Sequence, residues 1–217
     1  MNVRMASEPH TRDLTEQDVV AKYARLAPEY DARWSFYVEA TTRETLARLR
    51  LSPADRVLDV GCGTGALLRR LAESHPAGLL SGTDPVPEML AVARAQVPPE
   101  AELLEGWAER LPYGDERFDV VISCNMFHYI QRPADALREM RRVLKPGGRL
   151  VVTDWCDDYL ACRVCSWYLR VSGGESIKVY RRRECLRLLQ ETGYCDPEVE
   201  RYRISWLWGL MTATGTR

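Results

Sequence analysis

A glycine-rich turn carries the strongest chemical signal in the chain. Residues 57–65 read Val-Leu-Asp-Val-Gly-Cys-Gly-Thr-Gly, and apolar residues then recur at helical spacing over residues 66–72. This pattern predicts a buried strand, a tight turn and a helix. Glycine permits positive φ and lets a ligand approach the backbone, and the first turn of a helix offers unpaired N–H groups. The stretch therefore predicts a binding site for an electron-rich ligand, with a purely structural turn as the alternative.

A second acidic residue lies where nucleotide-binding folds often hold a ribose. Residues 79–83 predict a second strand that ends at Asp84, which is 19 residues beyond Gly65. An acid at roughly this distance accepts hydrogen bonds from ribose hydroxyls in α/β folds that bind nucleotides. Because residues 85–94 predict a helix, the alternative is that Asp84 caps that helix.

The rest of the chain alternates between strand and helix patterns. The predicted elements are strands over 101–105, 118–123 and 149–154, a helix over 133–145 stopped by Pro146-Gly147-Gly148, a helical insertion over 156–171, a helix over 181–192, and closing strands over 198–203 and 205–213. This alternation predicts an α/β fold, namely a doubly wound, mostly parallel, seven-stranded sheet.

The carboxyl ends of the predicted strands collect most of the polar and aromatic candidates. In a doubly wound sheet, ligands bind in the crevice beyond those ends. The stretches that fall there are 59–65, 84, 106–109, 125–128 and 154–155. One crevice can therefore hold all of them.

The N-terminal region is predicted to be a separate appendage. Val19, Tyr23 and Leu26 share one helical face, Pro28 interrupts the pattern, and a second helix follows before the first strand. We expect residues 1–50 to form a tail and a helical lid over the ligand site, with a fixed cap of the sheet as the alternative. Residues 51–217 are then the ligand-binding domain, with a helical insertion at about 156–183.

Composition excludes several classes of function. The 217 residues carry a net charge of −1, so no basic field points to nucleic acid or to an anionic membrane. No apolar run reaches the roughly 18 residues that a membrane span needs. Seven cysteines are an odd number in a chain of this size. This number argues against a disulfide framework and predicts a reducing, cytoplasmic setting.

Motifs in the central part of the chain resemble a known enzyme family. The stretches that carry the resemblance, in order and at the family's spacing, are 57–65, 82–90, 106–113, 118–121 and 144–148. Together they resemble the motifs of class I S-adenosylmethionine-dependent methyltransferases. The most similar group is the small-molecule branch that includes ubiquinone/menaquinone C-methyltransferases, whose Ala-x-x-Tyr-Asp element residues 27–31 faintly resemble.

The resemblance implies S-adenosyl-L-methionine as the cofactor and a role for each matching position. The implied cofactor-binding residues are Tyr30, Asp59, Gly61, Cys62, Gly63, Asp84, Pro85, Trp107, Ala108, Glu109 and Asn125. Asp59 would orient the amino group and Asp84 the ribose hydroxyls. Ala108 and Glu109 would face the adenine, and Asn125 would meet the methionine end. Trp107 departs from the family, which often has Asp there, so stacking or backbone contacts would hold the adenine.

Methyl transfer from a sulfonium is an in-line displacement that needs orientation above all. A general base is required only where the acceptor keeps its proton at neutral pH. His128 is the predicted catalytic base, because His10 and His75 lie off the predicted crevice. The alternative is a histidine that packs or contacts the cofactor. No metal is predicted, because the acidic and cysteine clusters lack a recognisable ligand spacing.

Aromatic residues crowd the predicted acceptor side, which favours a small apolar or aromatic acceptor or contact with a sulfonium. They are Tyr30, Trp34, Phe127, Tyr129, Trp155, Tyr159, Trp206 and Trp208. The alternative is that half of them fill the core. Cys156, Cys162 and Cys165 leave arsenite methylation as a minor alternative to scattered reduced thiols.

Two other functions stay open at this point. Gly61-x-Gly63-x-x-Ala66 also satisfies the dinucleotide fingerprint of an NAD(P)-binding oxidoreductase. A non-catalytic regulatory protein that keeps cofactor binding is the other. Nucleic-acid methylation is disfavoured, because residues 125–128 read Asn-Met-Phe-His where those enzymes have Asn/Asp-Pro-Pro-aromatic. The predicted partner is a small-molecule acceptor, and nothing in the sequence names the acceptor atom or sets an oligomeric state.

Overall fold

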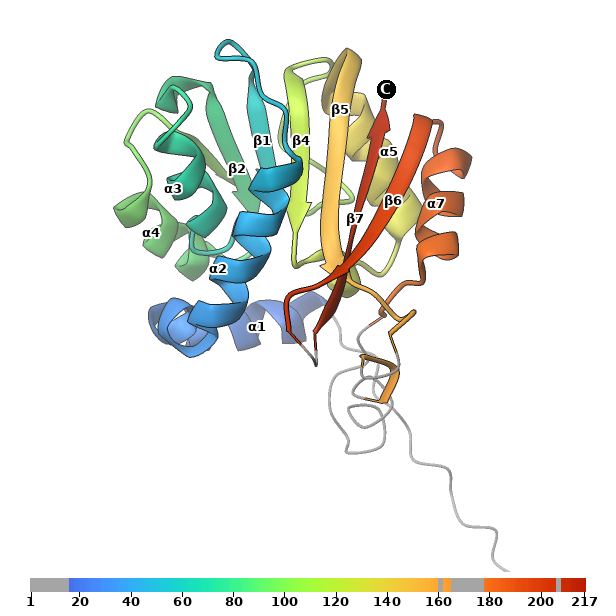
Figure 1. Ribbon diagram of the computed structural model, residues 1–217. Helices are drawn as coiled ribbons and strands as arrows, with labels where there is room; N and C mark the ends of the chain where they lie inside the picture. The colour runs from blue at the N-terminus through green and yellow to red at the C-terminus, as the bar shows by residue number, and fades with distance from the viewer. Residues whose placement is uncertain (1–15, 160–161, 165–177, 206–207) are drawn as a thin grey trace, which may run out of the picture.

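A computed structural model of the chain describes residues 16–159, 162–164, 178–205 and 208–217. Its centre is a seven-stranded sheet of order β3-β2-β1-β4-β5-β7-β6 with helices on both faces (Figure 1), which confirms the predicted doubly wound α/β fold. The strands are β1 Val57–Val60, β2 Leu80–Asp84, β3 Glu102–Glu105, β4 Phe118–Cys124, β5 Leu144–Trp155, β6 Cys195–Arg203 and β7 Gly209–Thr216.

Parallel pairing brings the carboxyl ends of five strands to one edge of the sheet. β3, β2, β1, β4 and β5 pair in parallel, whereas β7 pairs antiparallel with both β5 and β6. Every residue of β1 and β2 is buried, as expected for parallel strands covered on both faces. The edge below β1, β2 and β4 in Figure 1 is therefore where a ligand site is expected.

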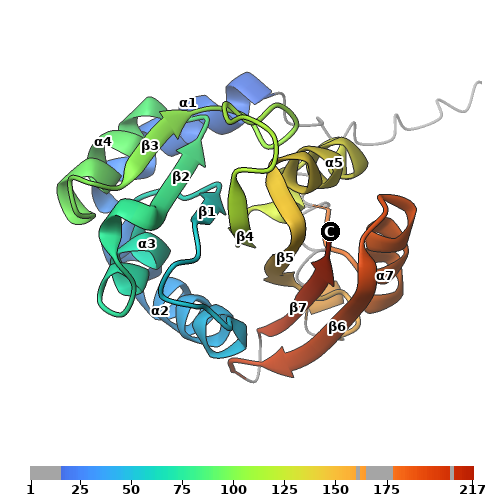
Figure 2. The ribbon, with the colours of Figure 1, turned by 90° about the horizontal axis from the view of Figure 1, so that it is seen from above.

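Two apolar layers attach the helices to the sheet. The helices are α1 Glu16–Leu26, α2 Tyr30–Arg48, α3 Ala66–Ala72, α4 Pro87–Gln96, α5 Pro133–Val143 and α7 Arg182–Glu191. Alternate residues of one strand point to opposite faces. Val57 packs with α3 and α4, whereas the next residue, Leu58, packs with α5 and α7. Figure 2, seen from above, shows α2, α3 and α4 on one face and α5 and α7 on the other.

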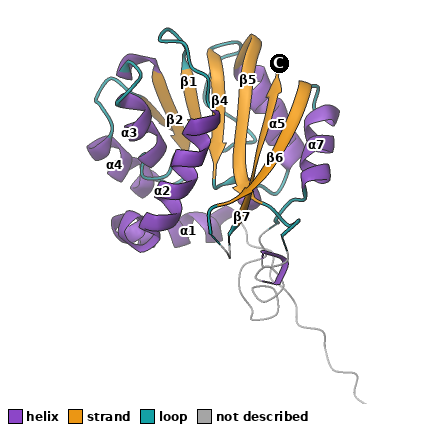
Figure 3. Ribbon diagram, viewed as in Figure 1, coloured by secondary structure: helices purple, strands orange, loops and turns teal. Residues whose placement is uncertain are grey.

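The N-terminal helices form the third part of the fold. α1 lies across the carboxyl edge of the sheet (Figures 1 and 3) and packs on the start of α4 through Val86 and Met89. Pro28 lies in a 3-10 turn, Ala27–Glu29, which joins α1 to α2. The second half of α2 packs on the sheet, where Thr41 and Thr45 are fully buried.

Several predicted boundaries are wrong by a few residues. α4 begins at Pro87 rather than at residue 85, because the Asp84 carboxylate accepts the Val86 N–H and holds a turn there. β5 begins at Leu144, so Pro146-Gly147-Gly148 belongs to the strand and does not separate it from the helix. β7 covers Gly209–Thr216 rather than 205–213, because the Ser205 hydroxyl accepts the Trp208 N–H in a preceding turn.

The predicted helical insertion lies largely outside the described residues. Residues 162–164 are helical, whereas Tyr180 forms a bridge with Cys156 in extended conformation. Cys165 and Trp206 also lie outside the described residues. Within the part of the chain that the structure describes, no helix is long and apolar enough to span a bilayer.

Gly148→Ala is expected to destabilise the fold without touching the carboxyl edge of the sheet. A Cβ at Gly148 would lie 2.8 Å from the Lys145 carbonyl oxygen and 3.1 Å from that of Asp119, and backbone atoms cannot move aside. Overpacking of this kind costs about 1–3 kcal/mol. A fall in Tm of roughly 2–4 °C per kcal/mol is then expected in a thermal unfolding scan.

Gly114→Ala is the matched control, because a Cβ there meets nothing within 4 Å. Equal unfolding temperatures for the two variants would contradict the packing at the start of β5.

Candidate functional site

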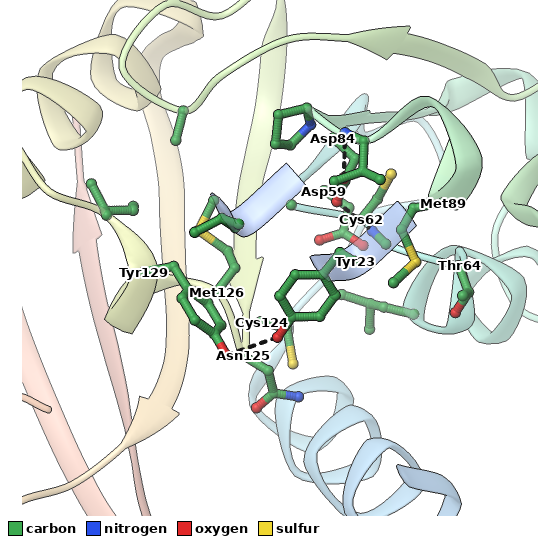
Figure 4. Close-up of a pocket in the computed structure, with 18 of the residues that line it drawn as sticks. Tyr23, Asp59, Cys62, Thr64, Asp84, Met89, Cys124, Asn125, Met126 and Tyr129 are labelled. Carbon is green, nitrogen blue, oxygen red and sulfur yellow. Dashed lines mark hydrogen bonds between the residues drawn. The ribbon is translucent and has the colours of Figure 1, made fainter. Parts of the chain in front are cut away.

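One cavity of about 1170 Å³, partly open to solvent, lies at the carboxyl edge of the sheet under α1. Ligand sites are typically concave, so this cavity is the candidate binding site. Figure 4 shows Asp59, Cys62 and Asp84 on one side of it and Asn125, Met126 and Tyr129 on the other. The residues of the predicted cofactor set that line the cavity are Tyr30, Asp59, Gly61, Cys62, Gly63, Asp84, Pro85, Trp107, Ala108, Glu109 and Asn125, which is the whole set.

The glycine turn is fixed by hydrogen bonds to the neighbouring strand. The N–H groups of Gly61 and Cys62 both donate to the Thr83 carbonyl, at 2.8 and 3.0 Å. Gly61 has φ +74°, and a Cβ there would lie 2.5 Å from Met126 Cγ. Only glycine combines that φ with that approach. The turn therefore brings bare backbone to the cavity.

Asp84 is oriented by the same turn. Its Oδ2 accepts the Gly63 N–H at 2.9 Å, and its Oδ1 accepts the Val86 N–H at 3.0 Å. Burial raises the pKa of this carboxyl to about 6, against the effect of these two backbone donors. The remaining lone pairs can accept two hydroxyls of a ligand without any rotation of the side chain.

Asp59 is the least satisfied polar group of the site. Its carboxyl is almost fully buried, and its Oδ1 has no hydrogen-bond partner among the described residues. Burial, with the charge of Asp84 as a second cause, raises the pKa of Asp59 to about 8. A buried, unpartnered carboxyl gains most from a cationic hydrogen-bond donor, which satisfies the oxygen and neutralises the charge.

The charges of the cavity have one sign. Asp59, Asp84 and Glu109 line it, and no Lys, Arg or His is found among the described lining residues. Tyr23, Tyr30 and Tyr129 add aromatic rings. The centroid of the Tyr23 ring lies 5.9 Å from that of Tyr30 and 5.6 Å from that of Tyr129. Carboxylates and aromatic faces both attract cations, so the lining selects a ligand that carries positive charge.

Asn125 lines the cavity in an unusual backbone conformation. It follows β4 and has φ +61°, in the left-handed region that few residues other than glycine adopt. Its side-chain amide is bonded to α2, where Tyr37 Oη donates to its Oδ1 at 2.8 Å and its Nδ2 donates to Thr41 Oγ1 at 2.6 Å. Tyr37 and Thr41 were missed at the sequence level, although their spacing of four residues puts them on one helical face.

His128 does not line the cavity. Its Nδ1 bonds to Asp154 Oδ1 at 2.7 Å, and its backbone N–H donates to Asp154 Oδ2 at 3.0 Å. The ring stacks on Trp155 with 5.3 Å between centroids and lies 4.2 Å from that of Tyr129, which does line the cavity. His128 therefore lies one side chain behind the wall, and its catalytic role stays a prediction.

Four of the remaining candidates do not line the cavity. Phe127 is buried against Tyr180, and Trp34 is 40% exposed on α2. Cys156 and Cys162 are buried. No group of three or more His, Cys, Asp or Glu side chains placed to hold a metal occurs among the described residues.

Comparison with known proteins shows that the chain is similar to methyltransferases. Residues 58–152 match the family model described as a methyltransferase domain. An uncharacterized methyltransferase of Mycobacterium tuberculosis is 45% identical over 108 residues, which are 49% of this chain and 42% of that protein. A demethylmenaquinone methyltransferase of Thermus thermophilus is 37% identical over 140 residues, 61% of this chain and 64% of that protein. The chain thus spans about two fifths to two thirds of the length of these curated relatives.

A solved structure agrees with the fold. The S-adenosylmethionine-dependent methyltransferase of Thermotoga maritima superposes with a TM-score of 0.75, covering 91% of this chain and 98% of that one. The sequences are 22% identical, so this likeness concerns the architecture alone.

Asp59→Asn is expected to stabilise the ligand-free protein at high pH. The pKa of Asp59, about 8 in the folded state, lies above its unfolded value of about 4. The folded state therefore binds more protons between these values, and its stability falls as pH rises from about 4 through about 8. An amide has no such titration, so Tm should rise relative to wild type at pH 8 and change least at pH 5.

Glu105→Gln, on an exposed carboxylate at the end of β3, is the control and should follow wild type at both pH values. A gain in Tm for Asp59→Asn that is equal at pH 5 and pH 8 would show that Asp59 is not protonated in the folded protein.

Proposed function

We propose that this chain, whose residues 58–152 match a methyltransferase domain and which is similar to a demethylmenaquinone methyltransferase, is an S-adenosylmethionine-dependent methyltransferase. Its acceptor is a small, apolar or aromatic molecule. The observation that carries the proposal is the unpartnered Oδ1 of Asp59 in a cavity lined by carboxylates and tyrosines. The proposed cofactor bears an ammonium and a sulfonium group, and both suit such a lining.

Different residues of the chain would bind different parts of this cofactor. Asp59 would pair with the ammonium, and Asp84 would accept the ribose hydroxyls. Trp107, Ala108 and Glu109 would contact the base, and Tyr30 and Asn125, which also line the cavity, would border the reacting end. When bound, the cofactor supplies a methyl group activated by its positive sulfur. The protein then has to hold the acceptor in line with that group and exclude water.

The hydrogen bonds of the glycine turn favour this cofactor over a dinucleotide. A pyrophosphate needs free N–H groups at the turn. Here the N–H groups of Gly61 and Cys62 bond to Thr83, and that of Gly63 bonds to Asp84. The carboxylate of Asp84 would also repel a phosphate. We therefore favour the methyltransferase over the NAD(P)-dependent oxidoreductase.

The acceptor class follows from the other half of the lining. Val19, Val38, Met126 and Ile130 present apolar surface, and Tyr129 adds an aromatic ring. An uncharged, largely apolar acceptor is desolvated at little cost on such a surface. His128 is the proposed base for an acceptor that carries a proton, since the bond from Nδ1 to Asp154 leaves Nε2 as the reactive nitrogen. To reach the acceptor, it requires Tyr129, which separates it from the cavity, to move aside.

Asp84→Ala is expected to weaken binding of S-adenosylhomocysteine, measured by calorimetry. Loss of hydrogen bonds to a charged group costs about 1.5–3 kcal/mol, which corresponds to a Kd raised roughly 10- to 100-fold. Glu105→Ala is the control, because Glu105 lies opposite Asp84 in the register of β2 and β3 but does not line the cavity. Unchanged affinity in Asp84→Ala removes Asp84 from the site, and binding of NAD but not of the nucleoside rejects the proposed function.

Hydrogen exchange tests the lid. Tyr23 and Tyr129 share a hydrogen bond of 2.8 Å between their hydroxyls, and Asp31 accepts the Thr64 hydroxyl at 2.6 Å. These bonds tie α1 and the start of α2 over the cavity. We expect exchange over residues 16–31 to slow when S-adenosylhomocysteine is added, while residues 41–45, which pack on the sheet, stay protected throughout. Equal and strong protection of residues 16–31 with and without the nucleoside makes α1 a fixed cap instead.

A further inference from the structure

The turn that ends β4 is held from outside the cavity. Asn125 occupies the left-handed region at φ +61° and contributes to the lining. Its amide points away from Asp59 and Asp84 and toward α2 (Figure 4). Asparagine adopts this region more readily than most residues because its side chain can hydrogen-bond locally. Here the side chain is bonded to α2 instead. The contacts of the Asn125 side chain hold this wall together with the bond from its backbone N–H to the Thr153 carbonyl, at 2.9 Å.

The hydrogen atoms in these contacts can be assigned from chemistry alone. The indole N–H of Trp155 can only donate, and its partner is the Tyr37 hydroxyl oxygen. The Tyr37 hydroxyl therefore uses its own hydrogen to donate to Asn125 Oδ1, at 2.8 Å. The Asn125 amide N–H then donates to Thr41, whose hydroxyl donates onward to the Tyr37 carbonyl. The direction of every bond from β5 to Asn125 is fixed.

Tyr37 is the centre of this chain of bonds and does not reach the cavity. Its side chain is 9% exposed, and its ring packs against Trp155 and Trp208 at centroid distances of 6.3 and 5.9 Å. It joins the end of β5 to the end of β4 through a helix that precedes both. No other element supplies a hydrogen-bond donor to Asn125 Oδ1 among the described residues.

We propose that Tyr37 is a positioning residue, whose hydroxyl holds the left-handed turn at Asn125 and thereby sets the geometry at the reacting end of the cofactor site. This inference rests on the proposed function and deepens it. Without the hydroxyl, Asn125 Oδ1 loses its donor and the turn relaxes toward ordinary backbone conformations. The wall beside the reacting group then moves, whereas the ribose end, fixed by Asp84, does not.

A double-mutant cycle separates positioning from packing. Glycine adopts positive φ without support, so Asn125→Gly removes the need for Tyr37. The four proteins compared are the wild type, Tyr37→Phe, Asn125→Gly and the double variant. Two ligands are titrated by calorimetry: S-adenosylhomocysteine, which has no group at the methyl position, and sinefungin, which carries an amino-bearing carbon in place of the methylated sulfur.

The expected result is selective. Tyr37→Phe should weaken sinefungin binding by roughly 5- to 10-fold, the effect of about one hydrogen bond, and change the Kd of S-adenosylhomocysteine by less than about 2-fold. In the Asn125→Gly background the same substitution should leave the Kd of both ligands unchanged, because coupled residues are not additive. Tyr194→Phe, which removes a buried hydroxyl bonded to the Leu137 carbonyl on the other face, should leave both affinities at wild-type values.

Four outcomes overturn the inference. Equal losses for the two ligands in Tyr37→Phe, or the same loss in the Asn125→Gly background, assign Tyr37 to packing alone, while binding of S-adenosylhomocysteine to wild type still supports the proposed function. An unchanged affinity for sinefungin in Tyr37→Phe also rejects it. Failure of wild type to bind either ligand rejects the proposed function and the inference together. Thermal unfolding of each variant confirms that binding is measured on folded protein.

Discussion

The two hydrogen bonds from Gly61 and Cys62 to the carbonyl of Thr83 are the constraint on which the site depends. They fold the chain back at the end of β1 and press it against the end of β2. Once the turn is there, the Gly63 N–H faces Asp84 and orients its carboxylate. The same bonds use two of the N–H groups that an anionic ligand could otherwise reach. One local arrangement therefore creates the acidic site and leaves fewer N–H groups of the turn for a phosphate.

The buried carboxylates make the site costly to fold and selective once folded. Asp59 and Asp84 lie close enough for the charge of one to raise the pKa of the other, and the described lining residues include no Lys or Arg to offset them. Protonation relieves part of this repulsion, but it leaves Asp59 Oδ1 without a partner. A ligand that brings a cation removes both penalties together. Selectivity for positive charge thus comes from unfavourable electrostatics in the ligand-free protein.

The sequence predicted the parts of the site that depend on local order. Glycines, an acid at the end of each of two strands, and strand–helix alternation are all set by neighbours in the chain, so residues 57–65 and Asp84 lie where the pattern indicated. The predicted ends of helices and strands were wrong where a single contact determines where the element begins. Asp84 bonds to the Val86 N–H and delays α4. β5 includes Pro146-Gly147-Gly148 because Leu144 pairs with Phe118 of β4, and the register shifts before the pairing resumes at Arg149. The secondary-structure propensities of the residues give no information about such contacts.

The contacts between segments that are distant in the chain could not be predicted from the sequence, for a different reason. Asn125 was expected to meet the ligand, yet its amide is engaged by Tyr37 and Thr41 of a helix more than 80 residues earlier. This pairing requires the register of α2 on the sheet, which no spacing in the sequence encodes. It also divides the N-terminal segment in two. The second half of α2 is bonded to the wall of the cavity and belongs to the domain, whereas α1 reaches the cavity through the Tyr23–Tyr129 hydrogen bond and the apolar contact with α4. A lid that opens would therefore bend within the first third of α2, near Trp34, where the helix departs from helical φ and ψ.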